Sequence, residues 1–244
     1  MTKITALIIT LHEDKHIGTC IDSLTGVVDE IIVLDSFSKD RTKEIALSKG
    51  ARVIEKEFLG FGEQKNLGAA TATNDYILSI DADEELSEDL RQSILKLKKT
   101  LSEEAYYVNR LNFIGDKPIR TCGWYPDIRT RLYNRKRAQW DKKEVHEELI
   151  VKDNVIFLKG DLLHHSYEDY DDMKRRTNRY AKLGAEMYKG TNKSVVAFKL
   201  LINPILKFIK TYFLQLGFTD GYAGWMISCY KARETFLKYY WALR

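Results

Sequence analysis

The chain has 244 residues, of which 44% are hydrophobic and 30% are charged. This length and composition predict one large domain, or a domain with an appendage, and exclude wholesale disorder. The three widely spaced cysteines exclude a disulfide framework and indicate a reducing compartment. The formal net charge is +4, and the segment 195–244 alone carries +5, so the basic character belongs to the C-terminal region.

Apolar runs and helical patterns alternate over the first hundred residues. The strand-like runs are Ile4–Thr10, Glu30–Asp35, Ala51–Lys56 and Tyr76–Ile80. The helix-like stretches are His16–Leu24, Arg41–Ser48, Gly62–Ala70 and Glu88–Thr100. This alternation predicts an α/β fold, with a mostly parallel central sheet flanked by helices. The opening run is too short for a signal-peptide core, and no uncharged run approaches the roughly 20 residues that span a bilayer.

The pattern changes after residue 100. Three further strand-like runs are Tyr106–Phe113, Arg129–Tyr133 and Val155–Lys159. A polar helix is predicted over residues 171–189, followed by two helices that break near Gly217–Gly224. We therefore expect a main domain over residues 1–190 and a C-terminal amphipathic helical region over residues 191–244.

Carboxylates follow two of the predicted strands. Asp35 ends the second strand, while Asp81 and Asp83 come at the end of the strand that begins at Tyr76. Ligands bind at the carboxyl edge of open α/β sheets, and two converging carboxylates favour a divalent cation and a nucleotide-linked substrate. Asp35 at this edge is suited to accept the imide N–H of a uracil base. The alternative for Asp81 and Asp83 is that they only favour the start of the next helix.

Four segments carry a resemblance to a known family. They are Thr10-Leu11-His12-Glu13, the acidic turn from Asp35 to Thr42, Gly62–Asn66 and Asp81-Ala82-Asp83. In this order they resemble the family 2 glycosyltransferases of the GT-A, Rossmann-like fold.

The resemblance implies roles for individual residues. Thr10, Glu13 and Asp35 would hold the uracil, Asp81 would touch the ribose, and Asp83 would ligate Mg²⁺ or Mn²⁺. Lys65, within Gly62–Asn66, is placed with the donor-binding residues. His12 departs from the family, which usually has Asn there.

The second half resembles one branch of the family, the bacterial lipopolysaccharide core β-1,4-glucosyltransferases. The segments that carry this resemblance are Gly123–Asp127, Arg129–Tyr133, Val145–Leu149, His164–Tyr167 and Gly217–Gly221. It implies a UDP-sugar donor, with glucose expected, and a lipid-linked glycan acceptor. It also implies a cytoplasmic enzyme that is peripheral to the inner face of the cytoplasmic membrane.

The remaining candidate residues each have an alternative. An inverting transfer needs a base for the acceptor hydroxyl, and we assign Glu147, with Glu148 second; the alternative is a solvated acidic pair. His164 would complete the metal shell or touch the diphosphate, or it is a structural histidine. Arg129 and Arg131 share one face of a strand and would meet the diphosphate or an anionic acceptor, or form surface salt bridges.

Two further features concern partners. Trp124 and Tyr125 are candidates for a sugar platform, with core packing as the alternative. Lys199, Lys207 and Lys210 fall on one stripe of a helix that is otherwise largely apolar, which is typical of a helix lying on a membrane. The alternative is a helix packed on the catalytic domain. No recognisable nucleic-acid-binding motif is present, so we expect no nucleic-acid partner.

We therefore predict an inverting, metal-dependent, non-processive glycosyltransferase. One alternative is a sugar-phosphate nucleotidyltransferase, which would carry a glycine-rich phosphate loop after the first strand, where this chain has Thr10–Lys15. The other alternative is a non-catalytic, membrane-associated module that binds a nucleotide sugar.

Overall fold

The computed structural model describes residues 1–101, 105–141, 147–151 and 155–244. The chain divides into two compact units. The first contains residues 1–110 and 127–164, and the second contains residues 111–126 and 165–244. The predicted boundary after residue 190 falls inside the second unit. The division into a main domain over residues 1–190 and a C-terminal amphipathic region over residues 191–244 stays a prediction.

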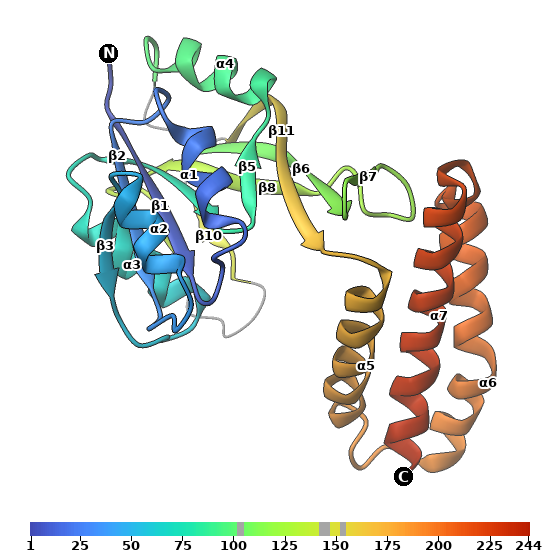
Figure 1. The fold of residues 1–244 in the computed structure, drawn as a ribbon. Helices are drawn as coiled ribbons and strands as arrows, with labels where there is room; N and C mark the ends of the chain where they lie inside the picture. The colour runs from blue at the N-terminus through green and yellow to red at the C-terminus, as the bar shows by residue number, and fades with distance from the viewer. Residues whose placement is uncertain (102–104, 142–146, 152–154) are drawn as a thin grey trace. The chain divides into compact units, whose positions relative to one another are not determined.

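The first unit alternates strands and helices along its first hundred residues (Figure 1). In chain order these are β1 (Ile4–Thr10), α1 (Ile17–Leu24), β2 (Glu30–Asp35), α2 (Thr42–Ser48), β3 (Arg52–Glu55), α3 (Phe61–Thr71), β4 (Tyr76–Asp81), β5 (Glu84–Leu86) and α4 (Glu88–Leu97). The predicted α/β fold, a Rossmann-like sheet flanked by helices, is confirmed. Ser87 caps α4 as its sequence position indicates, because its hydroxyl accepts a hydrogen bond from the Leu90 N–H at 3.3 Å.

Nine strands of the described residues form one sheet, in the order β3-β2-β1-β4-β8-β6-β11-β5, with β7 paired to β6. The later strands are β6 (Ala105–Ile114), β7 (Lys117–Ile119), β8 (Ile128–Asn134) and β11 (Val155–Tyr167). β9 (Gln139–Trp140) and β10 (Leu149–Ile150) form a separate pair. Strands β3, β2, β1 and β4 pair in parallel, whereas β8 joins β4 and β6 in antiparallel pairs. Parallel pairing is thus found where helices connect successive strands.

Strand β1 is buried on both faces of the sheet. Ile4, Ala6 and Ile8 pack into one core with side chains of α1, α2 and α4. Leu7 and Ile9 alternate with them and pack into a second core, to which α3 contributes Ala69. A strand covered on both faces needs an unbroken apolar run, which explains why β1 is apolar throughout rather than alternating.

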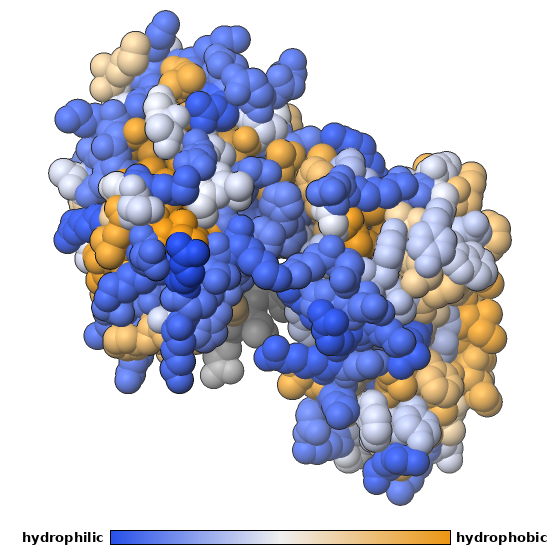
Figure 2. All heavy atoms as spheres, in the orientation of Figure 1, coloured by the Kyte–Doolittle hydropathy of each residue, from blue (hydrophilic) through white to orange (hydrophobic). Residues whose placement is uncertain are grey.

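The second unit is mainly helical. It contains α5 (Tyr170–Glu186), α6 (Lys193–Ile209), the π-helical turn η1 (Lys210–Leu214), the 3₁₀ turn η2 (Gly217–Asp220) and α7 (Tyr222–Leu243). Helix α7 packs against both α5 and α6, and the predicted C-terminal helical region is confirmed. Figure 2 shows apolar side chains along the side of α6 that is turned outward at the right of the view. None of the described helices combines the length and apolarity of a bilayer-spanning segment.

The predicted break near Gly217–Gly224 has a steric cause. Leu216 adopts a left-handed backbone conformation with φ 56°, which ends the preceding helical segment. A Cβ atom at Gly224 would lie 1.7 Å from the Gly217 carbonyl oxygen, so only glycine lets the start of α7 come this close to η2.

Candidate active site

The parallel strands bring the predicted carboxylates to one edge of the sheet. In the strand register Thr10 lies beside Asp35, and Ile9 lies beside Asp81. The carboxyl ends of β1, β2 and β4 therefore meet, as the sequence pattern predicts.

Asp35 organises the loop that follows β2. Its side chain is fully buried, and its carboxylate accepts hydrogen bonds from the Ser38 N–H at 2.8 Å and the Ser38 hydroxyl at 2.5 Å. The same hydroxyl oxygen accepts a bond from the His12 N–H at 2.9 Å, which ties the loop after β1 to the loop after β2. Asp35 does not line either cavity described below. Its contact with uracil stays a prediction.

A cavity of about 390 Å³ lies at this edge of the sheet. Its walls include five of the predicted site residues, namely Thr10, Glu13, Asp81, Asp83 and His164. The other lining residues are Ile9, Leu11, Ser36, Phe58, Phe61, Gln64 and Ala82. The Thr10 hydroxyl and the Gln64 amide oxygen are buried and have no hydrogen-bond partner in the described structure. Buried polar atoms without partners are costly, and a ligand in the cavity is one way to satisfy them.

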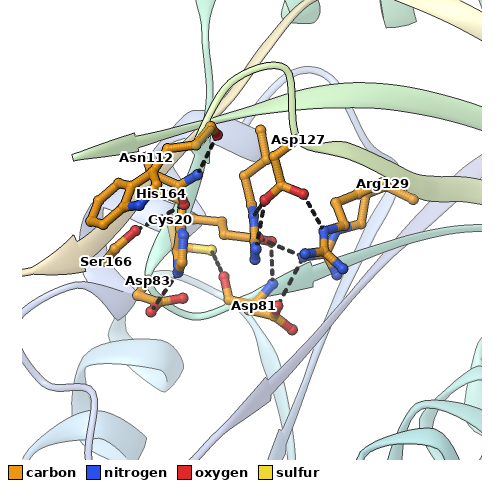
Figure 3. Close-up of polar contacts among 12 residues, drawn as sticks. Cys20, Asp81, Asp83, Asn112, Asp127, Arg129, His164 and Ser166 are labelled. Atoms are coloured by element: carbon orange, nitrogen blue, oxygen red, sulfur yellow. Dashed lines mark hydrogen bonds and ion pairs between the residues drawn. The ribbon is translucent and has the colours of Figure 1, made fainter. Parts of the chain in front are cut away.

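Asp83 and His164 come together although they are 81 residues apart in sequence. Strand β5 pairs with β11 and places His164 beside Glu84, the neighbour of Asp83. The His164 Nε2 atom lies 3.2 Å from the Asp83 Oδ2 atom. Figure 3 shows these two side chains pointing toward each other. Cis ligands of an octahedral cation at about 2.1 Å lie about 3 Å apart, so this donor pair fits a divalent cation. The described residues contain no cluster of three or more such ligands.

Asp81 is held by two cations in a buried network. The Arg131 Nη2 atom lies 2.9 Å from Asp81 Oδ2 and 2.5 Å from Glu84 Oε1, and the Lys65 Nζ atom lies 3.6 Å from Asp81 Oδ1. Burial alone would raise the pKa of Asp81, but Arg131 and then Lys65 outweigh it and hold that pKa well below its usual range. Asp81 is therefore ionised at every physiological pH.

A second cavity, of about 380 Å³, lies on the other side of Asp81. Five more of the predicted site residues line it, namely Lys65, Arg129, Arg131, Glu147 and Glu148. Its other lining residues are Asp81, Arg110, Ile128, Thr130, Trp140 and Leu149. Asp81 lines both cavities, so the two predicted groups of residues are neighbours.

Lys65 lies between Asp81, which lines both cavities, and Glu147, which lines the second. Its Nζ atom lies 2.7 Å from Glu147 Oε1 and 4.5 Å from the centre of the Trp140 ring, and its side chain is only 3% exposed. Helix α3 carries Lys65, and Asn66 on the same helix exchanges two hydrogen bonds with the Trp140 backbone, at 2.8 and 2.9 Å. A Cβ at Gly62 would lie 2.0 Å from the Asp141 carbonyl oxygen. The Gly62–Asn66 segment thus docks α3 against the chain that carries Glu147.

Arg129 and Arg131 occupy different environments. Arg131 is 4% exposed, and its pKa is raised because Asp81 and Glu84 outweigh the opposing effect of burial. Arg129 is 47% exposed, and its Nε atom lies 2.9 Å from Asp127 Oδ1. Both arginines form ion pairs, but only that of Arg129 is near the surface, as the salt-bridge alternative describes. Both also line the cavity, and their contact with the diphosphate or an anionic acceptor stays a prediction.

Several residues of the site were not predicted. Glu84 is buried, and besides Arg131 its carboxylate accepts a hydrogen bond from the Asp81 N–H at 2.9 Å, which fixes the turn after β4. Gln64 and Trp140 also line the cavities without having been singled out. The signal for Gln64 was its place beside Lys65 in a segment already marked by the resemblance.

Other predicted features lie elsewhere. Val145 and His146 of the Val145–Leu149 segment lie outside the described residues. Trp124 and Tyr125 belong to the second unit, where the Trp124 ring lies 5.8 Å from the Tyr167 ring and Arg120 lies over Tyr125 at 4.8 Å. Their role as a sugar platform stays a prediction.

Comparisons with known proteins agree with the resemblance. The family model described as "Glycosyl transferase family 2" matches residues 5–159. An uncharacterised glycosyltransferase of Rickettsia felis is 32% identical over 98% of this chain and 88% of its own length. The lipopolysaccharide core biosynthesis glycosyltransferase LpsC of Rhizobium meliloti is 27% identical over 96% of this chain and 89% of its own length.

Among solved structures, glucosyl-3-phosphoglycerate synthase of Mycobacterium tuberculosis in complex with Mn²⁺, UDP and glucosyl-3-phosphoglycerate is similar over 46% of this chain and 44% of the solved chain. The identity is 27% and the TM-score is 0.38, so this partial likeness supports no conclusion about the site. The family model covers more than half of the chain, and the Rickettsia relative matches nearly all of it. The chain belongs to glycosyltransferase family 2, and the protein is a glycosyltransferase.

Proposed function

We propose that this glycosyltransferase moves a hexose, with glucose as the first candidate, from a UDP-sugar to a lipid-linked glycan by a single inverting displacement. The observation that carries the proposal is the position of Asp81, which lines two adjoining cavities. One cavity contains the donor-side residues Asp83 and His164, and the other contains the candidate base Glu147. Such an arrangement can hold donor and acceptor on either side of one reacting centre.

The donor side fits a nucleoside diphosphate with a divalent cation. Asp83 and His164 would hold Mg²⁺ or Mn²⁺, and the cation would supply neutralisation of the departing diphosphate. Asp81 remains ionised beside them and is suited to accept hydrogen bonds from ribose hydroxyls. The unpartnered Thr10 hydroxyl and Gln64 amide oxygen are suited to the polar edge of the base.

The acceptor side supplies the proton acceptor. Glu147 is held at Oε1 by the ammonium group of Lys65, which orients its carboxylate in the second cavity. Its second oxygen would take the proton of the acceptor hydroxyl as that hydroxyl attacks the anomeric carbon. Glu148 is the second candidate, because its backbone is tied to Asp141 by two hydrogen bonds, at 3.0 and 3.1 Å.

Support for the acceptor class comes from the relatives. LpsC, by its name, acts in lipopolysaccharide core biosynthesis, and it aligns with nearly the whole chain. We therefore propose a lipopolysaccharide-core or other lipid-linked acceptor, and a location at the inner face of the cytoplasmic membrane. Membership of the glycosyltransferase family decides against a nucleotidyltransferase. A non-catalytic, nucleotide-sugar-binding module is the alternative that the following experiment tests.

The test compares Glu147→Gln with Glu148→Gln. Turnover of UDP-glucose to UDP is measured with Mn²⁺ and a lipid extract as the acceptor source, and UDP affinity is measured by calorimetry. Glu147→Gln should lower turnover by about 10²–10⁴-fold, because a general base is lost, while UDP affinity stays within about twofold. Near-normal turnover in Glu147→Gln with a large loss in Glu148→Gln would transfer the role to Glu148. A wild-type protein that binds UDP but turns over none of a panel of UDP-sugars would support the non-catalytic alternative.

A further inference from the structure

Helix α6 exposes a continuous apolar face. The most exposed of its side chains are Leu201 at 71%, Phe198 at 64% and Ile205 at 62%. The full set, here called the α6 apolar face, is Val195, Phe198, Leu201, Ile202, Ile205, Leu206 and Ile209. These positions recur at three- and four-residue intervals, so they form one stripe about 21 Å long. The same stripe is visible as the apolar band along α6 in Figure 2.

The face of α6 that packs within the second unit is more polar than the exposed one. Asn203 donates a hydrogen bond to the Tyr239 hydroxyl on α7 at 2.8 Å, and Lys199 lies over the Tyr188 ring at 5.1 Å. Val196 is the buried apolar residue of this helix. A helix at the surface of a water-soluble domain normally has the reverse arrangement, with its apolar stripe toward the core. An apolar patch of this extent marks an interaction surface.

Exposed aromatic and aliphatic side chains continue the surface beyond α6. In η1 and η2 these are Phe213, Leu214 and Phe218, and at the start of α7 they are Tyr222 and Trp225. Tyr212 joins three of these rings into one cluster, with ring centres 5.1 Å from Phe213, 5.6 Å from Trp225 and 6.3 Å from Phe218. Tyrosine and tryptophan favour the boundary between lipid headgroups and acyl chains, where one end of the ring is apolar and the other is wet.

The charge of the surrounding segment identifies the partner. Residues 191–224 contain four lysines, namely Lys193, Lys199, Lys207 and Lys210, and one acidic residue, Asp220. The Asp220 carboxylate already accepts a hydrogen bond from the Thr121 hydroxyl at 2.6 Å. A second copy of this chain would bring the same positive charges to the interface, whereas anionic lipid headgroups would neutralise them.

The structure also changes the role expected for the lysine stripe. Lys199 lies against Tyr188, and Lys207 acts electrostatically on Lys231 and Glu234 of α7. These lysines therefore border the side of α6 that packs on α7, and the α6 apolar face lies beside them. The apolar side chains therefore form the centre of the contact surface, and the lysines lie at its border.

We propose that the α6 apolar face, with the aromatic cluster that follows it, lies in the interfacial layer of an anionic membrane. The apolar side chains enter the boundary between headgroups and acyl chains, and the flanking lysines meet the phosphate groups. Membrane binding would bring the enzyme close to the lipid-linked acceptor of the proposed function. Only this consequence, and not the membrane surface itself, rests on the proposed function. The apolar part of the binding should persist at high salt, and the lysine part should not.

The test is co-sedimentation with vesicles of phosphatidylglycerol and phosphatidylcholine, and with vesicles of phosphatidylcholine alone, at low and high salt. The variant is Leu201→Gln with Ile205→Gln. The matched control is Leu183→Gln with Met187→Gln, which changes two exposed apolar side chains at the end of α5 and just after it, in the same unit. The α6 variant should bind anionic vesicles about a hundredfold more weakly, because each apolar side chain removed from the interface costs on the order of tenfold. The control should bind as the wild type does.

Two outcomes would overturn the proposal. One is equal vesicle binding by the α6 variant and the control. The other is that light scattering shows a dimer for the wild type and a monomer for the α6 variant, while the variant still binds vesicles. A second copy of the chain would then cover this face. UDP affinity in solution separates this proposal from the proposed function. Loss of vesicle binding with unchanged Mn²⁺-dependent UDP affinity supports the membrane surface, whatever the turnover of Glu147→Gln proves to be.

Discussion

Arg131→Met tests whether the buried network around Asp81 is part of the structural core of the site. The substitution keeps an unbranched side chain, two atoms shorter than that of arginine, and removes its charge. It leaves Glu84, which is fully buried, and Asp81 without the guanidinium that lies 2.5 and 2.9 Å from their oxygens. Arg110 remains 3.3 Å from Glu84 and compensates in part.

The expected loss in free energy of unfolding follows from this geometry. Removing one partner of a buried ion pair costs about 3–5 kcal/mol, because an uncompensated charge stays buried. Since Arg110 still reaches Glu84, we expect the lower end, about 3 kcal/mol. For a chain of this size 1 kcal/mol lowers the melting temperature by about 2–4 °C, so the expected decrease is about 6–12 °C.

Arg129→Met is the matched control, because it makes the same change on the same strand. Arg129 is 47% exposed and pairs with Asp127 at 2.9 Å. Exposed pairs contribute about 0–1 kcal/mol, so the melting temperature should fall by no more than about 4 °C. Scanning calorimetry of the two variants and the wild type measures the difference. Equal decreases for the two variants would show that burial of Arg131 does not determine its contribution, and the reasoning would be refuted.

Two further predictions concern the metal and the pH dependence of stability. Asp83→Ala should abolish the Mn²⁺-dependent part of UDP binding, because a hard cation loses an anionic oxygen ligand; calorimetry that found the same affinity with Mn²⁺ in variant and wild type would contradict this. The pKa of Asp29 is lowered, because the hydrogen bonds that its carboxylate accepts from Lys98, at 2.7 Å, and from the Ile4 N–H outweigh the effect of burial. The Asp29–Lys98 pair therefore stabilises the fold fully above the usual carboxyl pKa, and this stabilisation decreases as the pH falls below it. Lys98→Met should therefore lower stability most at neutral pH, and urea unfolding should show the gap to the wild type narrowing from pH 6 to pH 3; a constant gap would mean that Lys98 acts through packing alone.

The sequence predicted well which residues meet at the carboxyl edge of the parallel strands, because its signals there are local. Strands β1 and β2 have the predicted bounds, and β4 extends one residue further, since an apolar run that ends in Asp is a strand ending at the sheet edge. Parallel pairing then brings Thr10, Asp35 and Asp81 together without further information. The Asp-x-Asp spacing likewise marks Asp83. These inferences need only hydrophobic periodicity and the rule that ligands bind at carboxyl ends of parallel strands.

Short strands and buried ionic partners were not predictable in this way. Strands β5, β9 and β10 have two or three residues, too few for a periodic pattern. In the sequence, Glu84 cannot be distinguished from any other acidic residue before a helix. Its role becomes visible only in the structure, where β8 places Arg131 beside it. Asp35 lies at a sequence position typical of a ligand-binding carboxylate, and only the structure shows that its two oxygens accept hydrogen bonds from Ser38.

The sequence by itself determined the α/β fold, the family and the carboxylates at the edge of the parallel strands, because each depends on residues close together in the chain. Only the tertiary structure decided that Lys65 meets Glu147, 82 positions later, since that contact requires α3 to dock on the segment beside Trp140. It also decided which side of α6 is exposed. The sequence shows that the helix is amphipathic, but a helix can turn either face to its neighbour, and packing on α7 turns the apolar face outward.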